Sequence, residues 1–108
     1  MILAVDIGNS NIVIGGIEKD EILFEARLRT DATKTSDEYA VDLKMILDIY
    51  RVNRDTIEGT VVSSVVPQVD RALREAVRML TGVEAMVVDN TIRSDLTVLL
   101  DDPSTLAS

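Results

Sequence analysis

The sequence contains no cysteine and no histidine among its 108 residues. The absence of cysteine excludes disulfide bonds, zinc sites with thiolate ligands and a cysteine nucleophile. The absence of histidine excludes a serine–histidine–aspartate triad and metal ions bound by imidazole. Acid–base chemistry therefore falls to Asp, Glu, Lys or Tyr, and a bound metal would be a hard cation held by oxygen atoms, Mg²⁺ above all.

Aromatic residues, long apolar runs and positive charge are also scarce. Aromatic residues make up 3% of the chain, so the core has to be built from Val, Ile, Leu and Met. No apolar stretch approaches the roughly 18 residues of a membrane-spanning helix, and the first residues lack the basic segment of a signal peptide. The net charge of −8 disfavours binding to nucleic acid or to an anionic membrane. We therefore expect a cytoplasmic protein with neither of these partners.

Hydrophobic residues make up 46% of the chain and charged residues 28%, a balance typical of one globular domain. The apolar run at residues 2–7 predicts a strand buried on both faces. A second run at 12–17 predicts another strand, and the alternation over 22–29 predicts a third with one solvent-exposed face. Because the links between these strands are short, we expect an antiparallel meander.

Two helices and two further strands are predicted after the meander. Thr35 fits a capping box with Glu38, which predicts a helix with an apolar stripe at Ala40, Leu43, Leu47 and Tyr50. The second helix begins at Pro67, where a missing N–H costs little, and ends at Gly82. The remaining strands are predicted at residues 57–66 and 85–88. The order β-β-β-α-β-α-β predicts an α/β fold in which helices pack on a mixed five-stranded sheet.

The turn after the first strand is the most informative feature for function. It reads Asp6-Ile7-Gly8-Asn9-Ser10-Asn11, so a carboxylate in a buried strand is followed by a glycine and three polar residues. Backbone N–H groups and the side chains of this turn can donate to phosphate oxygens, and Asp6 can hold Mg²⁺. A plain hairpin turn explains the Gly-Asn pair equally well. The buried carboxylate favours the phosphate-binding interpretation because an unpaired one is costly, and both interpretations stay open.

Other polar groups are weaker candidates. Ser63 and Ser64 lie where a predicted strand ends before a helix, a place where ligands collect in open α/β sheets, although a strand end with two satisfied hydroxyls explains them as well. A helix cap explains the segment 35–39 without a binding role. The pair Asp101-Asp102 precedes a proline and is typical of an exposed acidic turn. A solvated helix face explains the basic row Arg71, Arg74 and Arg78.

The segment from Asp6 to Gly15 resembles the first phosphate loop of type III pantothenate kinases. The resemblance continues through residues 25–30, 35–39, 63–67, 87–88 and 101–103. It implies a ribonuclease-H-like sheet and the ATP-dependent phosphorylation of pantothenate, the first step of coenzyme A synthesis. It also implies Mg²⁺ and a monovalent cation, K⁺ or NH₄⁺. The nucleotide-binding residues that it implies are Asp6, Gly8, Asn9, Ser10 and Asn11, with Asp6 as the metal ligand.

The sequence departs from the family pattern at three places. Ser10 replaces the usual Thr and keeps the hydroxyl, whereas Asp95 stands where the family usually has Gly. Ala107-Ser108 occupy the place of the Gly-Ala that opens the family's Gly-Ala-Asp-Arg motif. The family's catalytic Asp would therefore lie beyond Ser108, and family members are more than twice this long.

These departures predict an N-terminal half of such a kinase. We expect residues 1–90 to form a ribonuclease-H-like domain that carries the first phosphate loop, and 91–108 to be a truncated interdomain connector. We expect this chain to contain no catalytic residue and to be inactive by itself. An exposed interdomain face predicts a homodimer or other self-association. The alternative is a non-catalytic half domain that binds phosphate or another protein.

Overall fold

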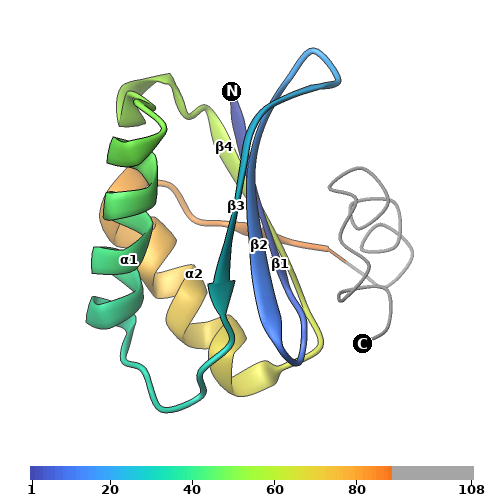
Figure 1. The fold of residues 1–108 in the computed structure, drawn as a ribbon, viewed down its shortest axis with the longest axis vertical. Coiled ribbons are helices and arrows are strands. Elements are labelled where there is room, and N and C mark those ends of the chain that lie inside the picture. Colours follow the sequence, from blue (N-terminus) through green and yellow to red (C-terminus); the bar gives the residue numbers. More distant parts are fainter. Residues whose placement is uncertain (89–108) are drawn as a thin grey trace.

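A five-stranded sheet carries two helices on one of its faces in the computed structural model, which describes residues 1–88 (Figure 1). The elements in chain order are β1 (Ile2–Ile7), β2 (Asn11–Glu18), β3 (Glu21–Arg29), α1 (Ser36–Ile49), the 3₁₀ turn η1 (Arg54–Thr56), β4 (Gly59–Ser64), α2 (Pro67–Thr81) and β5 (Met86–Val87). The predicted order β-β-β-α-β-α-β is confirmed. The expected connector 91–108, with Asp95 and the pair Asp101-Asp102, lies outside the described residues.

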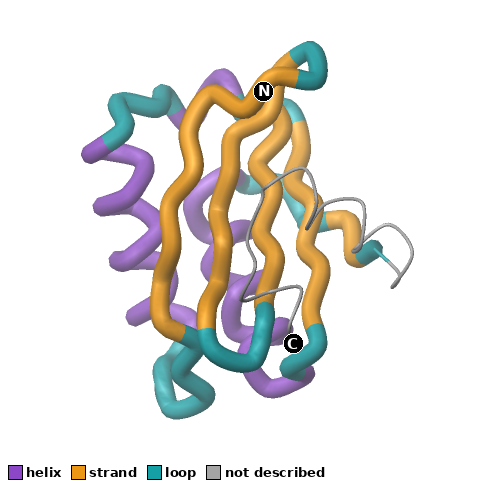
Figure 2. The backbone as a smooth tube through the Cα atoms, turned by 45° about the vertical axis from the view of Figure 1, so that its right-hand side comes forward, coloured by secondary structure: helices purple, strands orange, loops and turns teal. Residues whose placement is uncertain are grey.

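The strands lie side by side in the order β3-β2-β1-β4-β5, with both helices behind them in the view of Figure 2. β1, β2 and β3 form the antiparallel meander, whereas β4 pairs parallel with β1 on one side and with β5 on the other. The sheet is therefore mixed, as predicted. β1 occupies its centre, which explains why this strand is apolar on both faces.

The hydrophobic core fills the space between the sheet and the helices. β1 directs Leu3, Val5 and Ile7 into it, because every second side chain of a strand points to the same face. The helices contribute apolar side chains at helical spacing, namely Tyr39, Leu43, Ile46, Leu47, Val69, Leu73, Ala76 and Val77. Each fully buried Leu or Ile contributes about 1.5–3 kcal/mol to folding. Within the described residues, no helix is long and apolar enough to cross a membrane.

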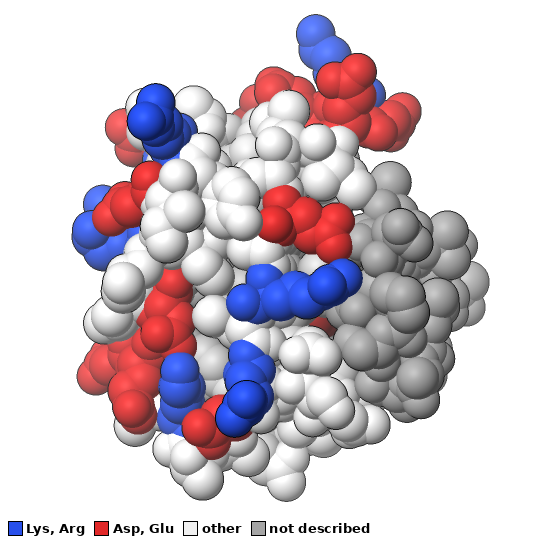
Figure 3. All heavy atoms as spheres, in the orientation of Figure 1, with Lys and Arg blue, Asp and Glu red and all other residues white. Residues whose placement is uncertain are grey.

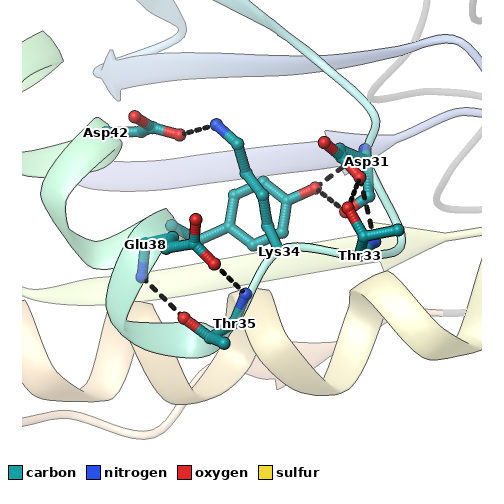
Figure 4. Close-up of polar contacts among 7 residues, drawn as sticks. Asp31, Thr33, Lys34, Thr35, Glu38 and Asp42 are labelled. Atoms are coloured by element: carbon teal, nitrogen blue, oxygen red, sulfur yellow. Dashed lines mark hydrogen bonds and ion pairs between the residues drawn. The ribbon is translucent and has the colours of Figure 1, made fainter.

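Local signals in the sequence set the helix ends. Thr35 Oγ1 accepts the Glu38 N–H at 3.1 Å and Glu38 Oε1 accepts the Thr35 N–H at 3.0 Å, so the predicted capping box is present (Figure 4). Pro67 opens α2, and Gly82 ends it in the left-handed conformation, with φ of 74° and its N–H bonded to Arg78 O. Both predicted helices are confirmed within a residue or two.

Three local predictions need correction. Tyr50 is 46% exposed rather than buried, because α1 ends at Ile49, and its ring stacks on Phe24 with 5.2 Å between centroids. Strict alternation over 22–29 would place Ile22 on the same inward face as Phe24, but a register shift between Gly16 and Ile17 leaves it 36% exposed. β4 is shorter than 57–66, since η1 precedes it and the Ser64 hydroxyl accepts the Val66 N–H at its end.

Gly16 provides a test of how tightly β2 packs against β3. A Cβ added there would lie 2.5 Å from Phe24 Cε1 and 2.7 Å from Met1 Sδ. We expect Gly16→Ala to lower the free energy of unfolding by about 1–3 kcal/mol, the usual cost of overpacking. The matched control is Gly59→Ala in β4, where the nearest atom is Ile2 Cδ1 at 3.4 Å. Urea unfolding of the two variants measures the difference, and equal stabilities would contradict the packing described here.

Candidate functional site

Polar side chains from three strands share the sheet face that points away from the helices. Leu3, Val5 and Ile7 point into the helix-covered core, so Asp6 lies on the opposite face. The same alternation places Asn11 on that face in β2, where Ile12 and Ile14 point to the core, and Ser63 in β4, where Val62 does. Asp6 pairs in register with Val13 on one side and with Ser63 on the other.

Asp6 and Ser63 form a buried hydrogen bond at the centre of this face. The Ser63 hydroxyl donates to Asp6 Oδ1 at 3.1 Å, and both residues are 0% exposed. Asp6 is the only buried carboxylate among residues 1–88. A carboxylate in such a place is costly unless hydrogen bonds or charges compensate it, and Ser63 provides part of that compensation. Sequence analysis singled out both residues separately, but only the parallel register of β1 and β4 brings them together.

The turn between β1 and β2 lies at the edge of the sheet beside this pair. Gly8 is buried and its N–H donates to Asn11 O at 2.9 Å, whereas Asn9 and Ser10 are exposed. Of the glycines in residues 1–88, only Gly82 has a positive φ, so Gly8 does not serve the turn through a left-handed conformation. Both backbone groups of Gly8 are held by hydrogen bonds, its carbonyl by the Thr30 hydroxyl and its N–H by Asn11 O.

Thr30 holds the turn from the neighbouring segment. Its hydroxyl donates to Gly8 O at 2.8 Å and its N–H donates to Ser10 O at 3.0 Å. On the other side, the Val65 N–H donates to Ile7 O at 3.1 Å. Sequence analysis did not single out Thr30, and its only signal was its place in the segment 25–30 that resembles the kinase family. The exposed turn is therefore fixed from two sides.

Tyr39 anchors the segment that follows Thr30. Its hydroxyl donates to Asp31 O at 2.7 Å and accepts the Asp31 N–H at 2.9 Å (Figure 4). Burial raises the pKa of Tyr39 above its ordinary 10.0, and the hydrogen bond to the Asp31 backbone opposes this less strongly. Hydrogen bonds from Thr33 hold the pKa of the Asp31 carboxyl below its usual range. Tyr39 is thus a structural residue and Asp37 is exposed, so neither adds to the turn.

The basic row on α2 belongs to a different surface. Arg74 pairs with Asp70 and Arg78 pairs with Glu75, as expected of a solvated helix face. A hollow of about 540 Å³ runs beside this row and the start of α1. Its lining includes no residue of the turn 8–11. We therefore keep the candidate site at Asp6, Ser63 and the turn.

The donor set at this site fits a magnesium ion. Among residues 1–88 no group of three or more acidic, cysteine or histidine side chains gathers, so a site that chelates a metal through protein side chains alone is not formed there. Mg²⁺ is commonly held by one or two carboxylates together with water and substrate phosphates. Asp6 supplies one such carboxylate, on the same face as the Asn11 amide.

Comparison with protein families matches residues 2–107 to type III pantothenate kinase. The chain belongs to this family. A type III pantothenate kinase from Bifidobacterium longum subsp. infantis is 42% identical over 108 residues, all of this chain and 42% of the relative. One from Finegoldia magna is 38% identical over 96 residues, 89% of this chain and 37% of the relative. The chain thus spans less than half the length of these curated relatives.

Two solved structures share the fold. A ROK hexokinase from Thermus thermophilus aligns with a TM-score of 0.60 and 13% identity, over 81% of this chain and 34% of the hexokinase. RuvC from Thermus thermophilus aligns with a TM-score of 0.52 and 16% identity, over 98% of this chain and 85% of RuvC. Both likenesses concern the fold, and they confirm the ribonuclease-H-like α/β class predicted from the sequence.

Replacing Tyr39 tests whether its hydroxyl holds the segment after Thr30. We expect Tyr39→Phe to cost about 1–3 kcal/mol of unfolding free energy, because the Asp31 backbone loses a donor and an acceptor. Tyr39 keeps its proton in the folded state at pH values where an unfolded tyrosine loses it. Its contribution is therefore complete below about pH 10 and is lost as pH rises through the raised pKa.

Urea unfolding between neutral pH and pH 11 measures both effects. Tyr39→Phe should show a smaller loss of stability above pH 10 than the unchanged chain. Tyr50→Phe is the control, because the Tyr50 side chain is 46% exposed and its hydroxyl has no hydrogen bond among the described residues. A Tyr39→Phe variant as stable as the control at every pH would show that the hydroxyl is dispensable.

Proposed function

We propose that the turn 8–11 is the first phosphate-binding loop of an ATP-dependent pantothenate kinase. The observation that carries the proposal is the buried Asp6–Ser63 pair next to an exposed turn at Asn9 and Ser10. β1 and β4 are parallel, so their carboxyl ends meet at this edge of the sheet, the usual place for ligands in open α/β folds. Membership of the type III pantothenate kinase family supports the same assignment.

Each residue of the loop has a distinct role in this proposal. Asn9, Ser10 and Asn11 donate hydrogen bonds to the phosphate oxygens, with backbone N–H groups of the exposed turn. Asp6 holds Mg²⁺ directly or through water, and Ser63 fixes the orientation of the carboxylate by its hydrogen bond. When bound, ATP supplies the phosphoryl group and Mg²⁺ offsets its charge. Thr30 keeps the turn in place during binding.

Further parts of the proposal concern the whole protein. Pantothenate is the proposed acceptor, K⁺ or NH₄⁺ the proposed monovalent cation and the cytoplasm the proposed location, each on the basis of family membership. We also propose self-association, as a homodimer, through the edge of the sheet. Met86 and Val87 of β5 are 66% and 52% exposed, and such apolar exposure at an edge strand favours association.

We propose that the 108 residues alone do not phosphorylate pantothenate. Phosphoryl transfer depends on positioning and charge neutralisation by several groups, and a general base has to reach the attacking hydroxyl. The only buried carboxylate of residues 1–88 is Asp6, which is assigned to the metal. The chain also spans 42% of the Bifidobacterium longum relative. The alternative, a half domain that only binds phosphate or protein, predicts the same inactivity and is separated from the proposal by the next experiment.

A chimera tests the function of the loop. This chain replaces the matching part of the Bifidobacterium longum relative, and phosphopantothenate formation is measured with ATP, Mg²⁺ and K⁺. We expect the chimera to turn over, Asp6→Asn to lower its turnover at least about tenfold by weakening the metal site, and the chain alone to be inactive. Asp20→Asn, in the hairpin at the far end of β2, is the matched control.

Three results would contradict parts of the proposal. Unchanged turnover and Mg²⁺ dependence in the Asp6→Asn chimera would remove Asp6 from the metal site. Turnover by the 108-residue chain, above a blank without protein, would show that these residues already contain a base. A folded chimera without activity, together with a chain that does not bind ATP, would favour the protein-interaction alternative.

A further inference from the structure

The proposed phosphate loop contains a negative charge and no positive one. Residues 6–11 include Asp6 but neither Lys nor Arg, and the whole chain has a net charge of −8. A nucleotide triphosphate brought to this turn meets a repulsive field that a single divalent cation offsets only in part. Loops that bind phosphate commonly add an Arg or a Lys, which pairs directly with the phosphate oxygens. Such a side chain would have to come from an element that borders the turn.

β3 brings Arg29 next to the turn. Arg29 is paired in register with Asn11, and the Cα atoms of such antiparallel pairs lie about 4.5–5.5 Å apart. Ala26 and Leu28 pack against the helix-side core, so Arg29 lies on the opposite face, the face of Asn11 and Asp6. The next residue, Thr30, donates two of the hydrogen bonds that hold the turn. Arg29 is thus fixed beside the turn through its own backbone.

Several basic side chains of residues 1–88 are already engaged by carboxylates. Lys34 pairs with Asp42, Arg74 with Asp70 and Arg78 with Glu75. The Arg29 side chain is exposed and forms no hydrogen bond or ion pair with any group of residues 1–88. The acidic group that feels its charge is Asp31, and hydrogen bonds from Thr33 already engage that carboxylate.

The surface charge agrees with this placement. In Figure 3 basic side chains lie over the end of β3 and the segment that follows it, while acidic side chains predominate along α1 and at the β2–β3 hairpin. The turn 8–11 lies at the end of the sheet where β3 finishes, since Asn11 pairs with Arg29, the last residue of β3. A phosphate at the turn therefore has basic side chains nearby.

We propose that Arg29 is a phosphate-binding residue that pairs with the oxygens of a nucleoside triphosphate held at the turn 8–11. This inference rests on the proposed function of the turn. The planar guanidinium can donate two parallel hydrogen bonds to one phosphate, which gives orientation as well as affinity. Arg29 supplies the charge that the turn itself lacks, while Asn9 and Ser10 supply neutral donors.

Titration of the 108-residue chain with inorganic triphosphate and Mg²⁺ tests the inference without requiring activity. Amide NMR shifts of residues 8–11 report binding at the turn, and repeating the titration at higher salt reports the charge involved. We expect Arg29→Gln to weaken binding about tenfold and to reduce its salt dependence, because one charged hydrogen-bonding partner is lost. Arg29→Lys keeps the positive charge but loses the two parallel donors of the guanidinium. Its affinity for triphosphate should therefore lie between those of the unchanged chain and Arg29→Gln.

Arg54→Gln is the matched control, since Arg54 is an exposed arginine in η1, which precedes the start of β4 at the opposite end of the sheet. It should bind as the unchanged chain does, and thermal unfolding confirms that each variant is folded. If triphosphate shifts the amide signals of residues 8–11 with equal affinity in the unchanged chain and in Arg29→Gln, the role of Arg29 is overturned and the function of the turn stands. If the unchanged chain shows no shift at residues 8–11, both are overturned.

Discussion

The parallel pairing of β1 with β4 is the constraint on which the rest of this structure depends. It joins strands that are separated in the chain by β2, β3, α1 and η1. Because β1 then has a strand on each side, it becomes the centre of the sheet, and its side chains from Leu3 to Ile7 are buried. The same register places Ser63 next to Asp6, so the step that completes the core also compensates a buried carboxylate.

The site combines a buried pair of side chains on two strands with an exposed turn. Asp6 and Ser63 are buried on interior strands and hydrogen-bonded to each other, whereas Asn9 and Ser10 are exposed in a turn that is held at Gly8 and Ser10 by Thr30. The segment 30–39 continues this support, because Tyr39 holds Asp31 and the capping box fixes the start of α1. Preorganised donors of this kind bind anions without a cost for ordering the loop.

Much of the fold was predictable because its signals are local. The capping box at Thr35, the proline at the start of α2 and the glycine at its end each act within a few residues, and the structure confirms all three. Two apolar runs and one stretch of side-chain alternation identified the three strands of the meander. The errors arose where the local pattern broke: the register shift after Gly16 turned Ile22 outward, and α1 ended at Ile49, which left Tyr50 exposed and stacked on Phe24. Such contacts leave no periodic signal in the sequence.

For the candidate site, the sequence by itself determined which residues are candidates and to which family the chain is similar. Asp6, Gly8 and the polar turn were identifiable because a carboxylate in an apolar strand before a glycine is unusual on energetic grounds. Only the tertiary structure decided that Ser63 is the partner of Asp6, that Thr30 holds the turn and that Arg29 lies beside Asn11. The physical reason is strand register: the pairing of β1 with β4 and of β2 with β3 depends on the packing of the whole sheet against α1 and α2, which no single segment specifies.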